Sequence, residues 1–370
     1  MARGTNSVPP TCATSGFRPF ELIRSVRNWK RAILFPTVPT LADVAAHAGV
    51  GIGTVSRVLS GSPNVSPEMR ERVLASAGLV GYQRTRRTAS QQERYPGYVG
   101  VLVPLFDSPS VTPRLRGIIS RLQPHDLELV LYNVDSPAQA RKQLVEIPKH
   151  SALQALIVLS LPVTDEQAAH LLEAPFPTVL ADSVNPALPS LRVDDRAGGE
   201  MATNHLISLG HTRIAFVGEP PNNPYGFSSS SNREVGYRRA LHSAGIPVEP
   251  QLSRHGAHVR SAGRQMASEL LSLAHPPTAI VASSDVQAMG CMEAAEAHGI
   301  SVPDDLSIVG YDDIEVASVL GITTIRQPLE RSGQRAAELI IEALSSGPRR
   351  PFVEQMEVDL VVRSTTASAK

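Results

Sequence analysis

The sequence predicts two structural parts, an all-α head of three short helices and an α/β body with two doubly wound parallel sheets around a cleft. Apolar residues recur at helical spacing in residues 40–49, 52–59 and 66–81. Further on, runs rich in Val, Ile and Leu alternate with amphipathic stretches, and these runs are residues 98–103, 127–132, 155–159, 178–181, 213–217, 279–282 and 307–309. Apolar strands separated by helices indicate parallel sheets covered on both faces. About 270 residues of this pattern exceed one such sheet, so two are expected.

The three helices of the head carry start and stop signals. Thr40 offers a capping hydroxyl to the first helix, and Gly49 ends it. The second helix is expected to turn its apolar residues inward, namely Val55, Val58 and Leu59. Ser66 and Pro67 are a strong start for the third helix, because serine caps well and proline fits the first helical position.

These patterns divide the chain into a leader, the head, a polar basic connector and the body, at residues 1–38, 39–82, 83–96 and 97–370. Within the body, one lobe is expected to take about residues 97–192 and 325–351. The other is expected to take about 193–322 and the C-terminal strand.

The net charge of zero conceals a polarity along the 370 residues. Residues 1–95 hold 13 basic and 5 acidic side chains, whereas the remaining 275 residues hold 22 and 30. A basic head on an acidic body indicates that the head meets a polyanion. Two cysteines, Cys12 and Cys291, exclude a disulfide scaffold, and no apolar run approaches the roughly 18 residues of a membrane span. A location in a reducing cytoplasm, away from the membrane, is therefore expected.

Two helices joined by a tight glycine turn, with a third packed across them, form a helix-turn-helix unit whose second helix enters the major groove of DNA. The residues left to face outward on that helix are Ile52, Gly53, Thr54, Ser56 and Arg57. Arg57 can pair with guanine through two hydrogen bonds, and Thr54 and Ser56 can bond phosphates or base edges. The other expected DNA contacts are Thr40, Asn64, Arg84, Arg86 and Arg87.

The leader has two interpretations. Its six basic residues against one acid suit an arm that adds non-specific affinity for DNA. Alternatively it is a disordered leader, or translation starts near Val38. Its apolar stretch is too short for a secretory signal.

Residues 41–50 (LADVAAHAGV), 54–59 (TVSRVL) and 65–73 (VSPEMRERV) resemble the DNA-binding head of the lactose/galactose repressor family. The body carries further matches in the same order, at residues 193–199, 206–218, 284–285, 302–313 and 323–328. The resemblance covers about residues 39–363. It implies a body like that of periplasmic binding proteins, a small effector in the cleft, a homodimer and a near-palindromic operator.

The recognition helix departs from the family pattern at its first two positions, which are often polar or aromatic in the family. Ile52 offers only apolar contacts, for example to a thymine methyl group, and Gly53 offers no side chain. We therefore expect Arg57 and Thr54 to carry most of the direct readout.

Ligands of open α/β sheets bind beyond the carboxyl ends of the strands. This rule selects five residues, Asp107, Asp182, Ser284, Asp285 and Asp312. The resemblance places four residues on ligand-contacting positions, Asp182, Arg233, Ser284 and Asp312, and His258 near a position that often holds a stacking aromatic. Several carboxylates with an arginine suit a polyhydroxylated ligand, so a sugar or sugar derivative is the expected effector.

Simpler roles are open for some of these residues. Asp285 and Asp195 suit helix caps, and His258 suits a solvated side chain. The aromatic residues available to stack on a sugar ring are Tyr225, Phe227 and Tyr311.

Two other function classes compete with a DNA-binding regulator. An enzyme is disfavoured because the sequence has no nucleophile elbow, phosphate-binding loop or paired-histidine zinc motif, and neither a cofactor nor a metal is expected. An exported small-molecule (sugar) binding protein without a regulatory role would share the body fold. The helix-turn-helix unit and the missing signal peptide disfavour it.

The connector yields a prediction about the shape of the bound operator. The resemblance implies a hinge helix that wedges a leucine into the minor groove, but the matching residue here is Gln91, and residues 84–92 contain no leucine. A polar residue is a poor wedge, because apolar insertion normally offsets the cost of unstacking bases. We expect a smaller operator bend than leucine-bearing relatives produce, measured by gel phasing. An equally large bend would contradict this expectation.

Overall fold

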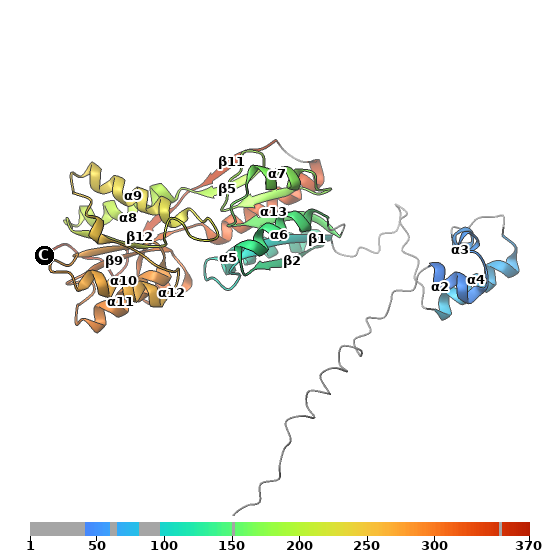
Figure 1. Cartoon of the computed structure of the whole chain (residues 1–370), viewed down its shortest axis with the longest axis horizontal. Helices are drawn as coiled ribbons and strands as arrows, with labels where there is room; N and C mark the ends of the chain where they lie inside the picture. Colours follow the sequence, from blue (N-terminus) through green and yellow to red (C-terminus); the bar gives the residue numbers. More distant parts are fainter. Residues whose placement is uncertain (1–40, 60–64, 81–96, 150–151, 348–349) are drawn as a thin grey trace, which may run out of the picture. The chain divides into compact units, whose positions relative to one another are not determined.

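The computed structural model describes residues 41–59, 65–80, 97–149, 152–347 and 350–370. They belong to two units, one within Met1–Gln92 and one within Glu93–Lys370 (Figure 1). Several residues singled out in the sequence lie outside the described residues, namely Thr40, Asn64, Arg84, Arg86, Arg87 and Gln91. None of the described helices has both the length and the apolar content needed to cross a lipid bilayer.

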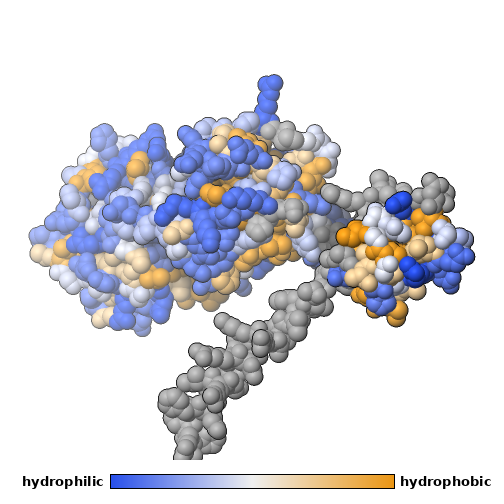
Figure 2. Space-filling model, turned by 45° about the vertical axis from the view of Figure 1, so that its right-hand side comes forward, coloured by the Kyte–Doolittle hydropathy of each residue, from blue (hydrophilic) through white to orange (hydrophobic). Residues whose placement is uncertain are grey.

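The helical unit consists of α2 (Leu41–Ala48), α3 (Ile52–Leu59) and α4 (Pro67–Leu79). Gly49 follows α2 with a φ of 62°, a left-handed conformation that glycine adopts without strain. The Ser66 side chain caps α4 by accepting a hydrogen bond from the Met69 amide at 3.3 Å. The core contains Val44, Ala45, Ala48, Val55, Val58, Val73 and Ala77. Figure 2 shows apolar surface on this unit, where Ile52, Leu74 and Leu79 are exposed.

The first lobe of the body is built on a parallel sheet of strand order β11-β5-β4-β3-β1-β2. Its strands are β1 (Gly97–Pro104), β2 (Leu127–Val134), β3 (Leu153–Leu159), β4 (Thr178–Ala181), β5 (Ser190–Val193) and β11 (Val353–Met356). Helices α5 (Val111–Leu122) and α13 (Leu329–Ser346) pack on one face, and α6 (Pro137–Glu146) and α7 (Asp165–Leu172) pack on the other. Short 3-10 turns occupy Gln123–His125 and Ile147–Lys149.

The second lobe repeats this architecture with strand order β12-β10-β9-β8-β6-β7, in which only β12 runs antiparallel to its neighbour. The strands are β6 (Ile214–Gly218), β7 (Ser253–His255), β8 (Ala279–Ala282), β9 (Ser307–Asp312), β10 (Thr323–Arg326) and β12 (Asp359–Val361). One face is covered by α8 (Asp195–Ser208) and α9 (Ser229–Ser243). The other is covered by α10 (Arg260–Leu271), α11 (Asp285–Ala297) and α12 (Glu315–Val319). A 3-10 turn, Pro250–Leu252, precedes β7.

The seven strands predicted from apolar runs all form, the expected C-terminal strand of the second lobe forms as β12, and the structure adds β5, β7, β10 and β11. These four are three or four residues long and carry polar residues, so no apolar run marks them. Ile325, expected in the first lobe, lies in β10 of the second sheet, whereas β11 pairs with β5 in the first. The chain crosses between the lobes three times, at β5–α8, β10–α13 and β11–β12 (Figure 1).

Three pairs of neighbouring helices cross at glycines. A Cβ added at any of these glycines would collide with the backbone of the partner helix, and the pairs are Gly117–Gly333, Gly199–Gly236 and Gly263–Gly290. They join α5 to α13, α8 to α9 and α10 to α11. Small residues at each crossing let the helices approach backbone to backbone over the sheets.

We expect Gly333→Ala to destabilise the body by about 1–3 kcal/mol, the usual cost of overpacking a core. Alanine is a better helix former by about 1 kcal/mol, so a destabilisation shows that the collision with the Arg114 carbonyl dominates. Urea unfolding measures the effect. Ser346→Ala, at an exposed position of the same helix, is the control, and a Gly333→Ala protein as stable as the control contradicts the prediction.

Candidate effector cleft and DNA-binding face

The outward face of α3 combines one apolar, two hydroxyl and one cationic side chain. Ile52, Gly53, Ser56 and Arg57 are exposed, and Thr54 is half-buried. Arg57 Nε donates a hydrogen bond to the Gly53 carbonyl at 3.2 Å. A Cβ at Gly53 would lie 3.9 Å from Arg57 Nη2, an ordinary van der Waals contact.

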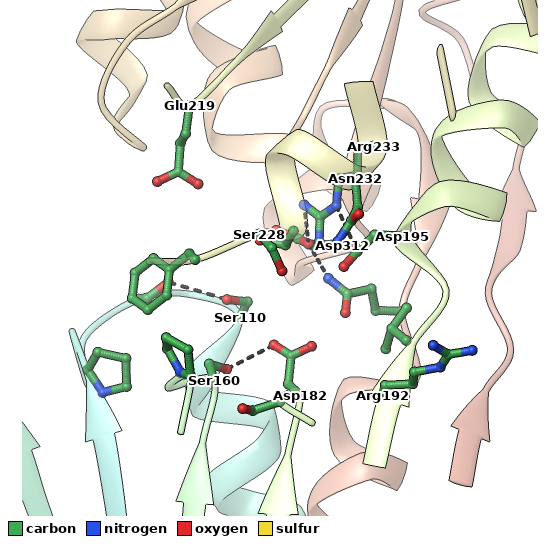
Figure 3. Close-up of a pocket in the computed structure, with 18 of the residues that line it drawn as sticks. Ser110, Ser160, Asp182, Arg192, Asp195, Glu219, Ser228, Asn232, Arg233 and Asp312 are labelled. Carbon is green, nitrogen blue, oxygen red and sulfur yellow. Dashed lines mark hydrogen bonds and ion pairs between the residues drawn. The ribbon is translucent and has the colours of Figure 1, made fainter. Parts of the chain in front are cut away.

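A cleft of about 580 Å³ lies between the two lobes of the body, at the carboxyl ends of both sheets. The first lobe contributes Ser110, Ser160 and Asp182, and the second contributes Asp195, Glu219, Asn232, Arg233 and Asp312 (Figure 3). Arg114 of the first lobe and His258 of the second also line the cleft. This volume lies within the range typical of small-molecule sites. The polar lining from two separate sheets is typical of a site that holds a polar ligand.

Arg233 is the central cation of the cleft. Its Nε donates to Asp195 Oδ1 at 2.8 Å, its Nη1 donates to the Ser283 carbonyl at 2.5 Å, and its Nη1 lies 3.6 Å from Asp312 Oδ1. The guanidinium also stacks on the Tyr311 ring, with Cζ 3.6 Å from the ring centroid. Burial alone would lower the pKa of Arg233, but Asp195, Tyr311 and Asp312 raise it overall. The side chain is therefore a fixed positive charge at the wall of the second lobe.

A second arginine connects the two lobes. Arg114 Nη2 donates to Asp182 Oδ2 at 3.2 Å and to Gln327 Oε1 at 3.0 Å, and Gln327 Nε2 donates to Asp312 Oδ1 at 2.5 Å. Ser160 also donates to Asp182, at 2.9 Å. Gln327 stands on the β10–α13 crossing, so this chain of hydrogen bonds runs from the first lobe through the crossing to the second.

Among the paired charges at the cleft, the carboxylates of Asp182, Asp195 and Asp312 outnumber the guanidinium groups of Arg114 and Arg233. Burial raises the pKa of Asp195, Arg233 lowers it, and the nearby Asp182 and Asp312 carboxylates raise it further. Two arginines facing three carboxylates leave acceptor capacity for ligand hydroxyl groups.

Glu219 and His258 form a separate pair in the second lobe. His258 Nδ1 lies 3.5 Å from Glu219 Oε2, and the histidine side chain is 28% exposed. Burial alone would lower the pKa of His258, but the hydrogen bond and charge of Glu219 raise it above the ordinary value.

Comparison with known proteins identifies both units. Residues 40–85 match the model of bacterial regulatory proteins of the lacI family, and residues 203–366 match a periplasmic binding protein-like domain. The HTH-type transcriptional regulator MalR of Streptomyces coelicolor is 33% identical over 345 residues, which cover 89% of this chain and 97% of MalR. Catabolite control protein A of Priestia megaterium is 28% identical, with 88% and 99% covered.

The chain belongs to the lacI family of bacterial regulatory proteins.

Solved lacI-family structures share the fold. A complex of the transcriptional regulator CelR with cellobiose has a TM-score of 0.64 at 31% identity, with 88% of this chain and 99% of that chain covered. A regulator from Enterococcus faecium with bound ribose has a TM-score of 0.66 at 29% identity, with 74% and 100% covered. The lac repressor dimer bound to operator has a TM-score of 0.66 at 26% identity, with 90% and 100% covered. These relatives are regulators and not enzymes.

The lacI-family assignment makes the protein a DNA-binding transcriptional regulator and sets aside the alternative of a binding protein without a regulatory role. Four effector candidates from the sequence line the cleft, namely Asp182, Arg233, His258 and Asp312. Asp107 does not line it and is exposed on the loop after β1.

Ser284, Asp285 and Asp195 take roles other than those predicted. Ser284, expected to contact the effector, is buried and caps α11 by accepting from the Gln287 amide at 3.2 Å. Asp285, expected to be that cap, instead accepts from Thr324 Oγ1 at 2.6 Å and from the Ile314 amide at 2.9 Å. Asp194 caps α8, which releases Asp195 to pair with Arg233. Both cap predictions were one residue out of register.

Of the aromatic residues predicted to stack on a sugar ring, Tyr311 is buried, whereas Phe227 lines the cleft. Tyr311 is buried beneath Arg233, so its ring cannot stack on a ligand. Phe227 lines the cleft, and its ring is stacked on Tyr225 with centroids 5.1 Å apart and an interplanar angle of 4°.

The sequence interpretation missed several cleft residues. Ser160 directly follows the predicted strand 155–159, and Glu219 lies two residues beyond the predicted strand 213–217, so the strand-end rule, applied to every strand, would have found both. Arg114 lies on α5 and Gln327 lies on the β10–α13 crossing. The two residues are 213 positions apart in the sequence, so no local pattern connects them.

The Glu219–His258 pair predicts a pH-dependent contribution to stability. Because the folded-state pKa of His258 is raised, its charged form contributes stability that is fully present below about pH 6.5, the unfolded value. That stability is lost as the pH rises through the folded-state pKa. Asp312 and Arg233 also act on His258, with opposite signs.

We therefore expect Glu219→Gln to lower the pKa of His258 and to flatten the pH dependence of the unfolding free energy above about pH 6.5. NMR titration of the His258 ring and urea unfolding at several pH values measure these effects. Glu296→Gln, which removes an exposed carboxylate from α11, should change neither. An unaltered His258 pKa in Glu219→Gln would show that the pair does not couple.

Proposed function

We propose that the protein is a dimeric repressor whose affinity for a near-palindromic operator is controlled by a small polyhydroxylated effector, a sugar or sugar derivative, bound between the lobes. The observation that carries the proposal is the cleft group of Arg114, Arg233, Asp182, Asp195 and Asp312. Hydroxyl groups that span the cleft would bond carboxylates of both lobes at once. Such a ligand stabilises one arrangement of the lobes over another, which is the condition for control of a distant site.

The face of α3 supports the DNA-binding half of the proposal. Arg57 can pair with guanine, Thr54 and Ser56 can bond phosphates or base edges, and Ile52, 53% exposed, can contact a thymine methyl group. Two such heads in a dimer would match the two halves of a palindrome. The lac repressor, a relative, binds its operator as a dimer.

Relatives also support the effector class. CelR forms a complex with cellobiose, and the Enterococcus faecium regulator holds ribose. The same cleft in this chain lies at the carboxyl ends of both sheets and presents several carboxylates beside an arginine. Coupling of about 1–3 kcal/mol between cleft and head would change operator affinity by about 5- to 150-fold.

Selection of fragmented genomic DNA by the purified full chain tests the proposal. We expect a few palindromic sites to be enriched, because specific regulators bind their sites about 10³–10⁷ times more tightly than random DNA. Arg57→Ala should lose this preference and retain weak binding to all sequences. Arg141→Ala, which removes an exposed cation from α6, is the matched control.

Sugars are then added to the complex with the enriched operator. A sugar that alters operator affinity supports the effector half, and purified protein that binds no sugar contradicts it. Enrichment by Arg57→Ala equal to that by Arg141→Ala would contradict the assignment of direct readout.

A further inference from the structure

The cleft contains a second set of polar side chains, Glu219 and His258, in addition to the cleft group of Arg114, Arg233, Asp182, Asp195 and Asp312 described above, here called the Arg233 group. Figure 3 shows Glu219 away from Asp195, Arg233 and Asp312, with Ser228 between them. Glu219 directly follows β6, and its partner His258 lies beyond the end of the neighbouring strand β7. The pair therefore faces a different part of the same cleft.

Glu219 retains unused hydrogen-bonding capacity. Its Oε2 faces His258 at 3.5 Å, whereas Oε1 accepts no hydrogen bond from any residue that the structure describes. Its side chain is 16% exposed. In the Arg233 group, by contrast, Asp182, Asp195 and Asp312 each pair with an arginine. Glu219 is thus a carboxylate positioned at the cleft with an oxygen available to a ligand.

An aromatic surface lies on the loop that follows Glu219. Phe227 lines the cleft, and Tyr225 supports its ring from one side in a parallel stack. Asn223 holds the loop in shape, since its Nδ2 donates to the Phe227 carbonyl at 2.6 Å and its Oδ1 accepts from the Phe227 amide at 3.0 Å. An aromatic ring and a carboxylate with a free oxygen that line the same cleft suit a sugar ring, whose C–H face is apolar and whose edge carries hydroxyls.

The same loop spans the two lobes. It leaves β6 of the second lobe, yet Tyr225 and Phe227 pack against the core cluster of the first. Gly226, with a φ of 75°, lies so close to Pro162 that an added Cβ would be 3.4 Å from its Cγ. A ligand that touches Phe227 therefore touches the contact that joins the lobes on this side of the cleft.

We infer that the effector carries two ring-sized units, one bonded to the Arg233 group and the other stacked on Phe227 with hydroxyls bonded to Glu219 and His258. The ligand class is a disaccharide or a glycoside with a second ring. The cleft of about 580 Å³ exceeds the size of one pyranose ring. This inference rests on the proposed function, because it assigns a second subsite to the same effector cleft.

The test is isothermal titration of the full chain with disaccharides and their constituent monosaccharides. The probes are maltose, cellobiose, lactose, trehalose, melibiose and xylobiose, with glucose, galactose, xylose and ribose. We expect at least one disaccharide to bind about tenfold or more tightly than either of its rings alone, the advantage that one further favourable contact of about 1.4 kcal/mol confers.

Two variants locate the second ring. Glu219→Gln should weaken the preferred disaccharide about 10- to 100-fold, because hydrogen bonds to a charged group are the strong ones. Phe227→Ala should weaken it about 3- to 10-fold, whereas Phe227→Tyr keeps the ring and the affinity. Neither loss should extend to a monosaccharide held by the Arg233 group. Glu296→Gln is the matched control, and thermal unfolding checks that each variant is folded.

The possible results separate the two proposals. A monosaccharide that binds as tightly as every disaccharide containing it, with Glu219→Gln and Phe227→Ala unaffected, overturns the second subsite and leaves the sugar effector standing. Protein that recognises its operator but binds no sugar overturns both. A disaccharide preference that survives both variants places the second ring elsewhere and also contradicts the inference.

Discussion

The buried guanidinium of Arg233 is the interaction on which the second lobe of the cleft depends. An unpaired charge at this depth would cost several kcal/mol, so its partners must be held in place. They come from the start of α8, the residue after β8 and the end of β9, as Asp195, Ser283 and Asp312. One cation thereby fixes the ends of three elements against α9. These contacts pair the buried charge and hold the side chains of the ligand-facing wall in place.

The first lobe is joined to this wall through Arg114 and Gln327. Arg114 binds Asp182 on its own lobe and Gln327 on a crossing, and Gln327 binds Asp312 on the other lobe. A rotation of one lobe against the other must break or lengthen a bond of this chain. A ligand whose hydroxyls replace those bonds in one arrangement, and not in another, is the physical means by which the cleft can favour one arrangement.

Much of the architecture could be predicted from local patterns. Gly49 ends a helix and Ser66 caps one, as their sequence patterns predict, and the apolar runs form the central strands. These features depend on interactions between residues close together in the sequence. The predictions of which residue caps a helix failed, because the backbone conformation decides between two adjacent candidates. Ser284 and Asp285, like Asp194 and Asp195, are adjacent residues that can each cap a helix, and only the backbone conformation selects one. The second member of each pair is then free for a tertiary contact.

Long-range pairing limits the prediction of the site itself. Asp182, Arg233 and Asp312 were accessible from strand ends and family motifs, but the partners that orient them were not. Arg114 meets Asp182 across 68 residues and Gln327 across 213, so both contacts exist only in the folded chain. Tyr311 was predicted as an aromatic that could stack on a sugar ring, but its ring instead packs against the guanidinium of Arg233, a residue distant in the sequence.

The order in which the strands enter the two sheets has a consequence for synthesis on the ribosome. The first sheet begins with β1 at residue 97, yet it is completed by β11 at residues 353–356, and the second sheet is completed by β12. Helix α13, which covers the first sheet, also comes after every strand of the second sheet except β12. A nascent chain therefore carries an apolar face of the first sheet that only α5 covers while all of the second lobe except β12 is being made. Exposed apolar surface of this kind is prone to aggregation, so nascent chains of this topology have an extended need for chaperones.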